Sequence, residues 1–181
     1  GSEDELDEIG WDELADDALL LVEWADRAEG RLADSRLDVE LTLAPDLGPE
    51  ARRARLTGFG ALGERLQRLN LAEGLIAASG LDQAERRFLQ GDASSRSYTR
   101  LVLPERSAIL MNAPHQPDGP PIQNGLPYSR LVHLAEDVKP FVAMDRALIA
   151  QGLSAPVIEA ADLDAGLLVI EDLGREGVVS G

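Results

Sequence analysis

The sequence contains no cysteine, so neither disulfide bonds nor thiolate metal sites are available to it. Lysine occurs once, as Lys139, and Pro140 follows it. A phosphate-binding loop of the form GxxxxGK[ST] needs a lysine before a hydroxyl residue, so this loop is excluded from the sequence. The sequence also has no signal peptide and no apolar run long enough to span a membrane. These absences are typical of a protein of the reducing cytoplasm.

Negative charge dominates the chain, whose formal net charge is -16 over 181 residues. This excess argues against the chain itself binding nucleic acid or an anionic membrane, because both need clustered basic residues. Nine acids fall between Glu3 and Asp17, and no basic residue precedes Arg27. We expect residues 3–16 to form an amphipathic helix with a solvated acidic face. The chain begins without Met, and we expect it to be a fragment.

The apolar run from Ala18 to Val22 predicts a strand that is covered on both faces and ends on Glu23 and Trp24. Ligands of parallel sheets lie beyond such strand ends, although the local sequence alone favours a structural role for this pair. Apolar residues then alternate at 37–43, and bases alternate in part of the segment that follows the next turn. This pattern predicts an antiparallel hairpin with one buried face and with acids opposite bases. The run ARRAR is therefore interpreted as a cross-strand charge match rather than a nucleic-acid site.

Further along the chain, the pattern predicts two helices that meet at Asn70 and divide the chain into domains 1–69 and 70–181. The predicted elements are helices at 60–69, 71–79 and 137–151, strands near 96–103, 107–112, 156–161 and 166–171, and a long proline-rich loop at 114–127. We find no internal repeat.

The first domain has a family resemblance. DELDEIGWDELADDALLLVEWADR followed by RLDVELTL resembles the carboxyl-terminal half of the TsaE (YjeE) family, the P-loop ATPases of bacterial tRNA threonylcarbamoyladenosine synthesis. The resemblance covers about residues 3–69 and implies part of a P-loop NTPase sheet with a C-terminal hairpin. It implies that Glu23 lies near Mg²⁺ and the ATP phosphates, that Trp24 lies beside the nucleotide, and that TsaB- and TsaD-like proteins are partners. Without the phosphate loop, this half is not expected to hydrolyse ATP alone.

The second domain resembles another family. FLQGDASSRSYTRLVLPERSAILMNAP and DVKPFVAMDRALIAQGLSAPVIEAADLDAGLLVIEDLG resemble the amino-terminal lobe of the aminoglycoside-phosphotransferase-like kinases, an antiparallel sheet plus a helix. Within 72–177 the resemblance is strongest to the branch that phosphorylates cell-wall amino sugars at the anomeric position. It implies that GDASSRSYTR covers the ATP phosphates: Gly91 permits close backbone approach, and Ser94, Ser95 and Arg96 offer donors. The bare motif, taken alone, favours an ordinary turn.

The resemblance also implies a hinge at IEDLG, where the backbone of Glu171, Asp172 and Leu173 pairs with adenine. Taken alone, this segment is a strand that ends at a turn. The strand that carries the phosphate-pairing lysine of protein kinases here offers Met111 and Asn112 instead. The absence of lysine fits the sugar-kinase branch, which tends to read LMDAP, but Asn112 departs from its Asp.

The sequence assigns neither catalytic residues nor histidine metal ligands. The catalytic loop of the kinase family belongs to a lobe beyond residue 181, so no catalytic residue is assigned in this chain. His115 and His133 lack additional ligands at metal-binding spacing, which favours solvated or helix-capping roles.

Together these features predict a cytoplasmic fragment of a bifunctional bacterial protein with α/β and α+β parts. Its parent would join an ATPase subunit for tRNA modification to an ATP- and Mg²⁺-dependent kinase of a small amino sugar, and the fragment itself is expected to be inactive. One alternative is a non-catalytic interaction module with degenerate nucleotide sites, in which the acidic face of residues 3–17 docks a partner protein. A second alternative keeps the TsaE-like half active and makes the kinase-like half a scaffold.

Overall fold

The computed structural model describes residues 19–28, 30–89, 96–115, 117–127, 131 and 137–174. The chain divides into two compact units, Gly1–Gln67 and Arg68–Gly181. The helix predicted at 3–16 lies outside the described residues. Of the helices that are described, none is both long and apolar enough to cross a membrane.

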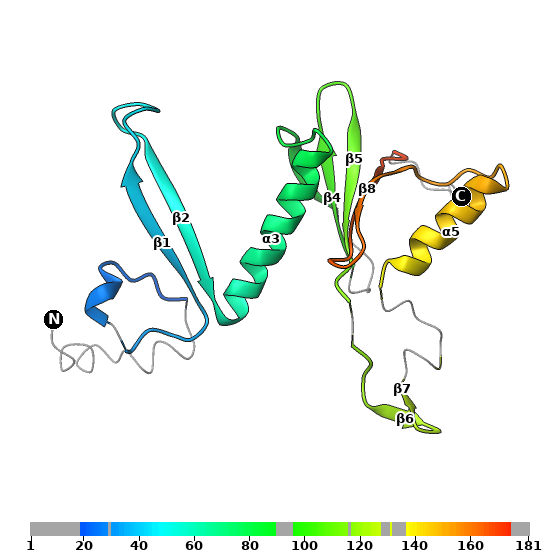
Figure 1. Ribbon diagram of the computed structural model, residues 1–181, viewed down its shortest axis with the longest axis horizontal. Coiled ribbons are helices and arrows are strands. Elements are labelled where there is room, and N and C mark those ends of the chain that lie inside the picture. The colour runs from blue at the N-terminus through cyan, green and yellow to red at the C-terminus, as the bar shows by residue number, and fades with distance from the viewer. Residues whose placement is uncertain are drawn as a thin grey trace. The chain divides into compact units, whose positions relative to one another are not determined.

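Unit 1 contains the predicted hairpin, which is formed by β1 (Arg36–Leu43) and β2 (Arg52–Phe59) (Figure 1). The two strands pair antiparallel, and the register sets Glu40 opposite Arg55. The Arg55 Nη1 atom lies 3.6 Å from Glu40 Oε2, so the predicted match of acids with bases is confirmed at this pair. Both side chains are exposed, and such a pair contributes only about 0–1 kcal/mol.

The apolar side of this hairpin is not covered by the described residues. Its large side chains are between 41% and 67% exposed: Leu37, Val39, Leu41, Leu43 and Leu56. The alternation places them on one face, as predicted, but burial also requires a second layer of structure. The prediction of a buried face is therefore wrong for the described part of this chain.

The strand predicted at 18–24 is also wrong over the residues that are described. Residues 19–22 have no regular structure, and a 3-10 helix, η1 (Ala25–Ala28), follows them. Leu19 and Leu21 are 98% and 95% exposed. A strand needs hydrogen-bond partners on a neighbouring strand, and within the described part of unit 1 the two strands pair only with each other.

A single helix, α3 (Gly60–Ala78), replaces the two helices that were predicted on either side of Asn70. Asn70 lies in its interior, where asparagine costs only about 0.5 kcal/mol relative to alanine, and the leucines and alanines around it favour a helix. Near the start of the helix, the Ser35 hydroxyl accepts a hydrogen bond of 3.2 Å from the Leu62 N–H. The boundary between the two units thus falls within a continuous helix.

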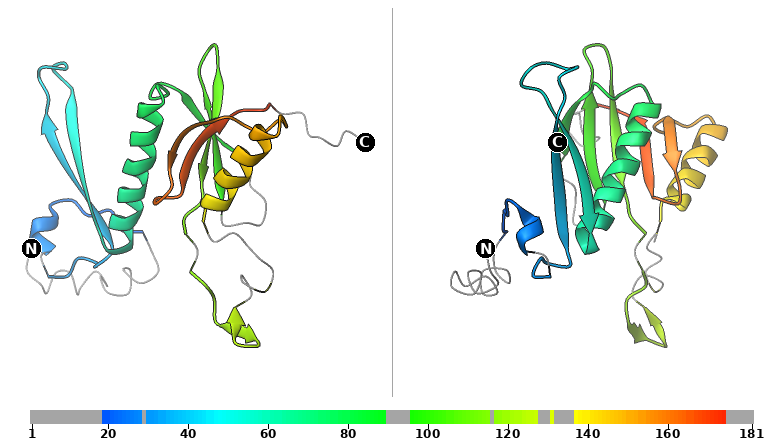
Figure 2. Two further views of the ribbon diagram at one scale, coloured as in Figure 1. Left: turned by 45° about the vertical axis from the view of Figure 1, so that its right-hand side comes forward. Right: turned by 60° about the vertical axis from the view of Figure 1, so that its left-hand side comes forward.

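Unit 2 is built on an antiparallel five-stranded sheet with the strand order β3-β4-β5-β9-β8 (Figures 1 and 2). Its strands are β3 (Glu85–Leu89), β4 (Ser97–Val102), β5 (Ser107–Asn112), β8 (Ile158–Asp162) and β9 (Leu167–Glu171). The four strands predicted in this region are confirmed, with ends that differ by one or two residues.

Both faces of the central strands of this sheet are buried. On one face, Leu110 and Val169 pack with Ala72 and Ile76 of α3. On the other face, Met111, Leu168 and neighbouring apolar side chains pack with Val138 and Val142 at the start of α5 (Lys139–Ala150) (Figure 2). Consecutive residues of β5 and β9 point to opposite faces, so each central strand reads as a continuous apolar run.

Helix α5 confirms the predicted helix at 137–151. The Asp137 carboxylate accepts a hydrogen bond of 2.8 Å from the Lys139 N–H at its start. Pro140 occupies the first turn, where its missing N–H costs nothing. Gly152 follows the end of the helix with φ 75°, the role predicted for it.

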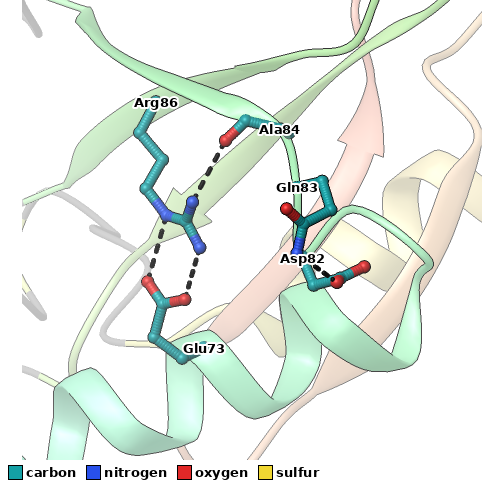
Figure 3. A network of polar contacts seen from close by, with 5 residues as sticks. All are labelled: Glu73, Asp82, Gln83, Ala84 and Arg86. Atoms are coloured by element: carbon teal, nitrogen blue, oxygen red, sulfur yellow. Dashed lines mark hydrogen bonds and ion pairs between the residues drawn. The ribbon is translucent and has the colours of Figure 1, made fainter. Parts of the chain in front are cut away.

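The edge strand β3 is tied to α3 by a forked ion pair (Figure 3). The Arg86 guanidinium donates to both carboxylate oxygens of Glu73, at 3.1 Å from Nε to Oε1. The same guanidinium donates to the carbonyl oxygen of Ala84 at 3.0 Å. Charged side chains of this kind also protect an edge strand from pairing with other chains.

The proline-rich segment contains a small hairpin, so the prediction of an irregular loop at 114–127 is wrong in part. Strand β6 (Pro121–Gln123) pairs with β7 (Leu126–Pro127). Between them, Asn124 and Gly125 have φ values of 51° and 75°. Two consecutive positive φ values are typical of the turn that Asn-Gly favours in hairpins.

Gly166, in the turn between β8 and β9, lies against the backbone at the end of β5. Its carbonyl accepts a hydrogen bond of 2.9 Å from the Ala113 N–H, and its φ is 67°. A Cβ atom at this position would lie 2.1 Å from the Ala113 carbonyl oxygen. Only glycine fits here without moving the backbone.

We expect Gly166→Ala to lower the free energy of unfolding of unit 2 by more than about 2 kcal/mol, since it adds a steric clash to the cost of a positive φ. Gly152→Ala is the matched control, because Gly152 has φ 75° but no atom within 4 Å of its added Cβ. The control should lose only about 1 kcal/mol. Urea unfolding followed by circular dichroism measures both changes, and equal losses would contradict the prediction.

Candidate functional site

The predicted phosphate loop falls, along the chain, between β3 and β4. Gly91, Ser94 and Ser95 lie outside the described residues. The flanking strands β3 and β4 are antiparallel, with Leu89 opposite Tyr98. Arg96 is half-buried immediately before β4. The roles of these four residues stay predictions.

The predicted hinge begins at the end of β9. The Glu171 N–H donates to the Val157 carbonyl oxygen at 2.8 Å, and the Glu171 carboxylate accepts from the Val157 N–H at 3.0 Å. Glu171 therefore fixes the segment that leads into β8. Its carboxylate is used within the fold, so any contact with a base would come from its backbone.

Asp172 is the centre of a buried polar network. Its Oδ2 atom accepts a hydrogen bond of 2.6 Å from the Ser107 hydroxyl, and Oδ1 accepts bonds of 3.0 Å from Arg100 Nη2 and from the Gly174 N–H. Arg100 Nε lies 2.7 Å from Oδ2 as an ion pair, but its N–H is not aligned for a hydrogen bond. The side chains of Arg100 and Asp172 are only 11% and 5% exposed.

This network holds the Asp172 carboxylate in its ionised form. Burial raises its pKa, but the hydrogen bonds from Ser107, Gly174 and Arg100 together with the Arg100 charge outweigh burial, and the pKa lies below its ordinary value. With its carboxylate occupied, Asp172 is a structural residue of the predicted hinge. The next residue, Leu173, is 66% exposed, and its N–H has no hydrogen-bond partner among the described residues.

Met111 and Asn112, at the end of β5 where the sequence departs from the kinase pattern, both make contacts within the fold. Met111 is 1% exposed in the core, so an apolar side chain fills the place of the usual lysine. The Asn112 side-chain oxygen accepts hydrogen bonds from Arg68 Nε, at 2.9 Å, and from Arg68 Nη2. Burial lowers the pKa of Arg68, although the charge of Asp162 acts in the opposite direction.

Asp145 on α5 was missed by the reasoning from sequence. It is 5% exposed, and its Oδ1 atom has no hydrogen-bond partner among the described residues. A buried carboxylate oxygen without a donor is costly, so this residue is a candidate for contact with a group from outside the described residues. The signal in the sequence is its spacing: Asp145 follows Val142 by three residues and so lies on the buried side of the helix.

In unit 1, Glu23 and Trp24 are both exposed, and Trp24 is 73% exposed. Trp24 has a φ of 58°, which is rare for a bulky residue, and the Arg27 guanidinium lies 5.9 Å from its ring centre. No group of three or more His, Asp or Glu side chains able to hold a metal occurs within the described ranges. The metal role of Glu23 stays a prediction.

His115 is exposed, which agrees with the solvated role favoured by the sequence, and His133 lies outside the described residues.

The Asp172 network predicts a specific dependence of stability on pH. A carboxyl whose pKa is lowered on folding stabilises the fold above its unfolded pKa of about 4, and this contribution is lost as the pH falls further. We expect Asp172→Asn to reduce the stability of unit 2 near pH 7 by roughly 3–5 kcal/mol, because it leaves Arg100 buried without its partner. The acid-induced loss of stability should then be smaller in the variant.

Denaturant unfolding between pH 2.5 and 7 measures this dependence. Glu85→Gln is the control, since the hydrogen bond from Arg87 lowers the pKa of this exposed carboxyl, yet its ion pair contributes little. An Asp172→Asn variant with the acid dependence of the unsubstituted chain would contradict the role given to Asp172.

Asn112→Asp tests the contact with Arg68. A carboxylate in place of the amide should stabilise unit 2 by about 1 kcal/mol, because a bond between two charged groups is stronger than one to a neutral acceptor. The control is a double-mutant cycle with Arg68→Met, in which the gain should vanish. A gain that persists without Arg68 would show that the stabilisation has another origin.

Comparison with known proteins finds similarity to N-acetylmuramate/N-acetylglucosamine kinases. The chain is 45% identical over 110 residues to that of Caulobacter vibrioides, and 36% and 34% identical over 85 residues to those of Pseudomonas aeruginosa and Pseudomonas putida. The alignments cover 56%, 47% and 47% of this chain. No family model and no solved structure matches the chain.

These relatives are much longer than the part that matches. The alignments cover 30% of the Caulobacter protein and 20% of each Pseudomonas protein. The antiparallel sheet of unit 2, with a helix between its third and fourth strands, is compatible with a kinase-like amino-terminal lobe. The TsaE-like part and the P-loop sheet find no support among these relatives. The similarity therefore supports a kinase-like segment in this chain.

Proposed function

We propose that unit 2 is the nucleotide-binding lobe of a kinase that transfers a phosphoryl group from ATP to an amino sugar. The observation that carries this proposal is the 45% identity over 110 residues to the Caulobacter kinase. That length is close to the span of the resemblance, residues 72–177. By this likeness the substrate is an N-acetylated amino sugar, and the reaction takes place in the cytoplasm, where ATP is available.

The geometry of the hinge fits an adenine base. Glu171 and Asp172 use their side chains within the fold, whereas the Leu173 N–H has no partner among the described residues. A backbone N–H can donate to a ring nitrogen of adenine. ATP, once bound, supplies the phosphoryl group. The role of this chain is then to orient the base at Leu173 and to cover the phosphates with the segment around residues 91–96.

Because β5 carries no lysine, the positive charge that neutralises the ATP phosphates has to come from elsewhere in the protein. Met111 is buried, and its thioether carries no charge that could neutralise a phosphate. In the proposal, Arg96 contributes positive charge from the start of β4, and the residues that hold Mg²⁺ belong to another part of the parent protein. The described residues of unit 2 do not form a cluster suited to a metal.

A second candidate function concerns unit 1. We propose that it is the end of a TsaE-like ATPase domain that works with TsaB- and TsaD-like proteins in tRNA modification. The observation that favours this function is the exposed Trp24 beside Glu23, held at φ 58°. Unfavourable backbone conformations in folded proteins cluster at functional sites. The uncovered apolar face of β1 and β2 also fits a domain whose second layer lies outside the described residues.

Binding of the chain to a purified TsaB–TsaD complex tests this second function. Trp24→Ala is expected to leave the hairpin folded, because the indole is exposed. If unit 1 contributes to a shared nucleotide site, the emission of Trp24 should change when Mg²⁺-ATP and the complex are both present. Binding with an unchanged emission would argue against a shared nucleotide site, and absence of binding would overturn the TsaE-like function.

The kinase proposal is tested with a chimaera in which residues 72–177 of this chain replace the matching segment of the Caulobacter kinase. We expect the chimaera to transfer phosphate from ATP to N-acetylmuramate within about tenfold of the parent rate, a difference of about 1.4 kcal/mol. Leu173→Pro, which removes the free N–H, should raise the KM for ATP. Leu173→Ala keeps this N–H and serves as the control. A folded but inactive chimaera would overturn the proposal, as would equal KM values for the two variants.

A further inference from the structure

Three segments of unit 2 that are distant in sequence meet around the Asp172 carboxylate. Arg100 lies in β4 opposite Ile109 of β5, and Ser107 is the first residue of β5. Asp172 directly follows Glu171, which is opposite Ala108. The side chains of Arg100 and Ser107 thus approach the turn after β9 from two neighbouring strands.

The bonds of this network enclose the turn 172–174. Arg100 Nη2 donates to Asp172 Oδ1 at 3.0 Å and to the Gly174 carbonyl oxygen at 3.1 Å. The Gly174 N–H donates back to Asp172 Oδ1 at 3.0 Å, and Ser107 holds the second oxygen of the carboxylate. Both polar backbone groups of Gly174 are therefore fixed. Leu173 lies between these fixed points with its side chain exposed.

A buried ion pair of this kind is not required for stability alone. Removing two charges from water costs several kcal/mol, and apolar residues of similar size often stabilise a fold as well or better. The network instead fixes the orientation of the turn 172–174, because each hydrogen bond restricts the angle as well as the distance between its groups. Arg87 provides the contrast: it lies opposite Arg100 on β3, and its ion pair with Glu85 is exposed and involves no turn.

We propose that Arg100 and Ser107 are positioning residues, which hold the turn 172–174 so that the Leu173 N–H is presented to the adenine base. This inference rests on the proposed kinase function, since it assigns the residues behind the nucleotide contact of that site. Neither residue touches the reacting phosphate. Both act through the Asp172 carboxylate, and Arg100 also acts through the carbonyl of Gly174.

Amide hydrogen exchange in the chain itself tests the restraint on the turn. In Arg100→Met and Ser107→Ala, we expect the Gly174 amide to exchange at least about tenfold faster than in the unsubstituted chain, a loss of about 1.4 kcal/mol of local protection. Arg87→Met is the matched control and should leave this amide unchanged. Ser107→Ala keeps the ion pair, so it gives a reading even if Arg100→Met does not fold. Unchanged exchange at Gly174 in a folded variant would overturn the restraint.

The ratio of the KM values for ATP and GTP in the chimaera tests whether Arg100 and Ser107 position the nucleotide contact or only stabilise the fold. We expect Arg100→Met and Ser107→Ala to raise the KM for ATP several-fold while the KM for GTP changes less, so that discrimination between the bases falls. Arg87→Met should keep the original discrimination. If exchange at Gly174 becomes faster but base discrimination is unchanged, the positioning role is overturned and the kinase function stands. If the unsubstituted chimaera is inactive, the kinase function fails, and with it the nucleotide role of the turn.

Discussion

The antiparallel pairing of β5 with β9 is the constraint on which unit 2 depends. Both strands lie in the interior of the sheet and are buried on both faces, so their apolar residues join the two halves of the core. Burial of one such leucine or isoleucine contributes about 1.5–3 kcal/mol. Their register also fixes the two ends of the strand pair: Ala108 lies opposite Glu171 at one end, and Asn112 lies opposite Leu167 at the other.

The two ends of this strand pair have different tasks in the proposed kinase lobe. At one end, Asp172 is held by Arg100 and Ser107, and the turn after β9 becomes a fixed place for a base. At the other end, Ser97 lies opposite Asn112, and Arg96, which precedes Ser97, is the residue proposed to contribute positive charge.

The exposed apolar residues of β1 in unit 1 and the buried Asp145 of unit 2 share one property: each side chain lies in an environment that does not suit its polarity. The apolar residues of β1 are exposed where alternation predicts a buried face, and Asp145 is buried where its chemistry requires a partner. Each arrangement costs free energy within the described residues, and contact with further protein would remove that cost. The reasoning from sequence found the first feature by its period, but it missed the second because a single acid on a helix looks like a solvated residue.

The sequence by itself determined the elements whose cause is local. Alternation predicted the hairpin with acids opposite bases, and the helical period with Gly152 predicted α5. Only the tertiary structure decided that residues 19–22 form no strand and that α3 continues through Asn70, since strands need partners and helices are stabilised by packing. It also decided that Arg100 meets Asp172, 72 residues away, and Arg68 meets Asn112, 44 residues away. No local pattern encodes such contacts, because they depend on which strands become neighbours in the sheet.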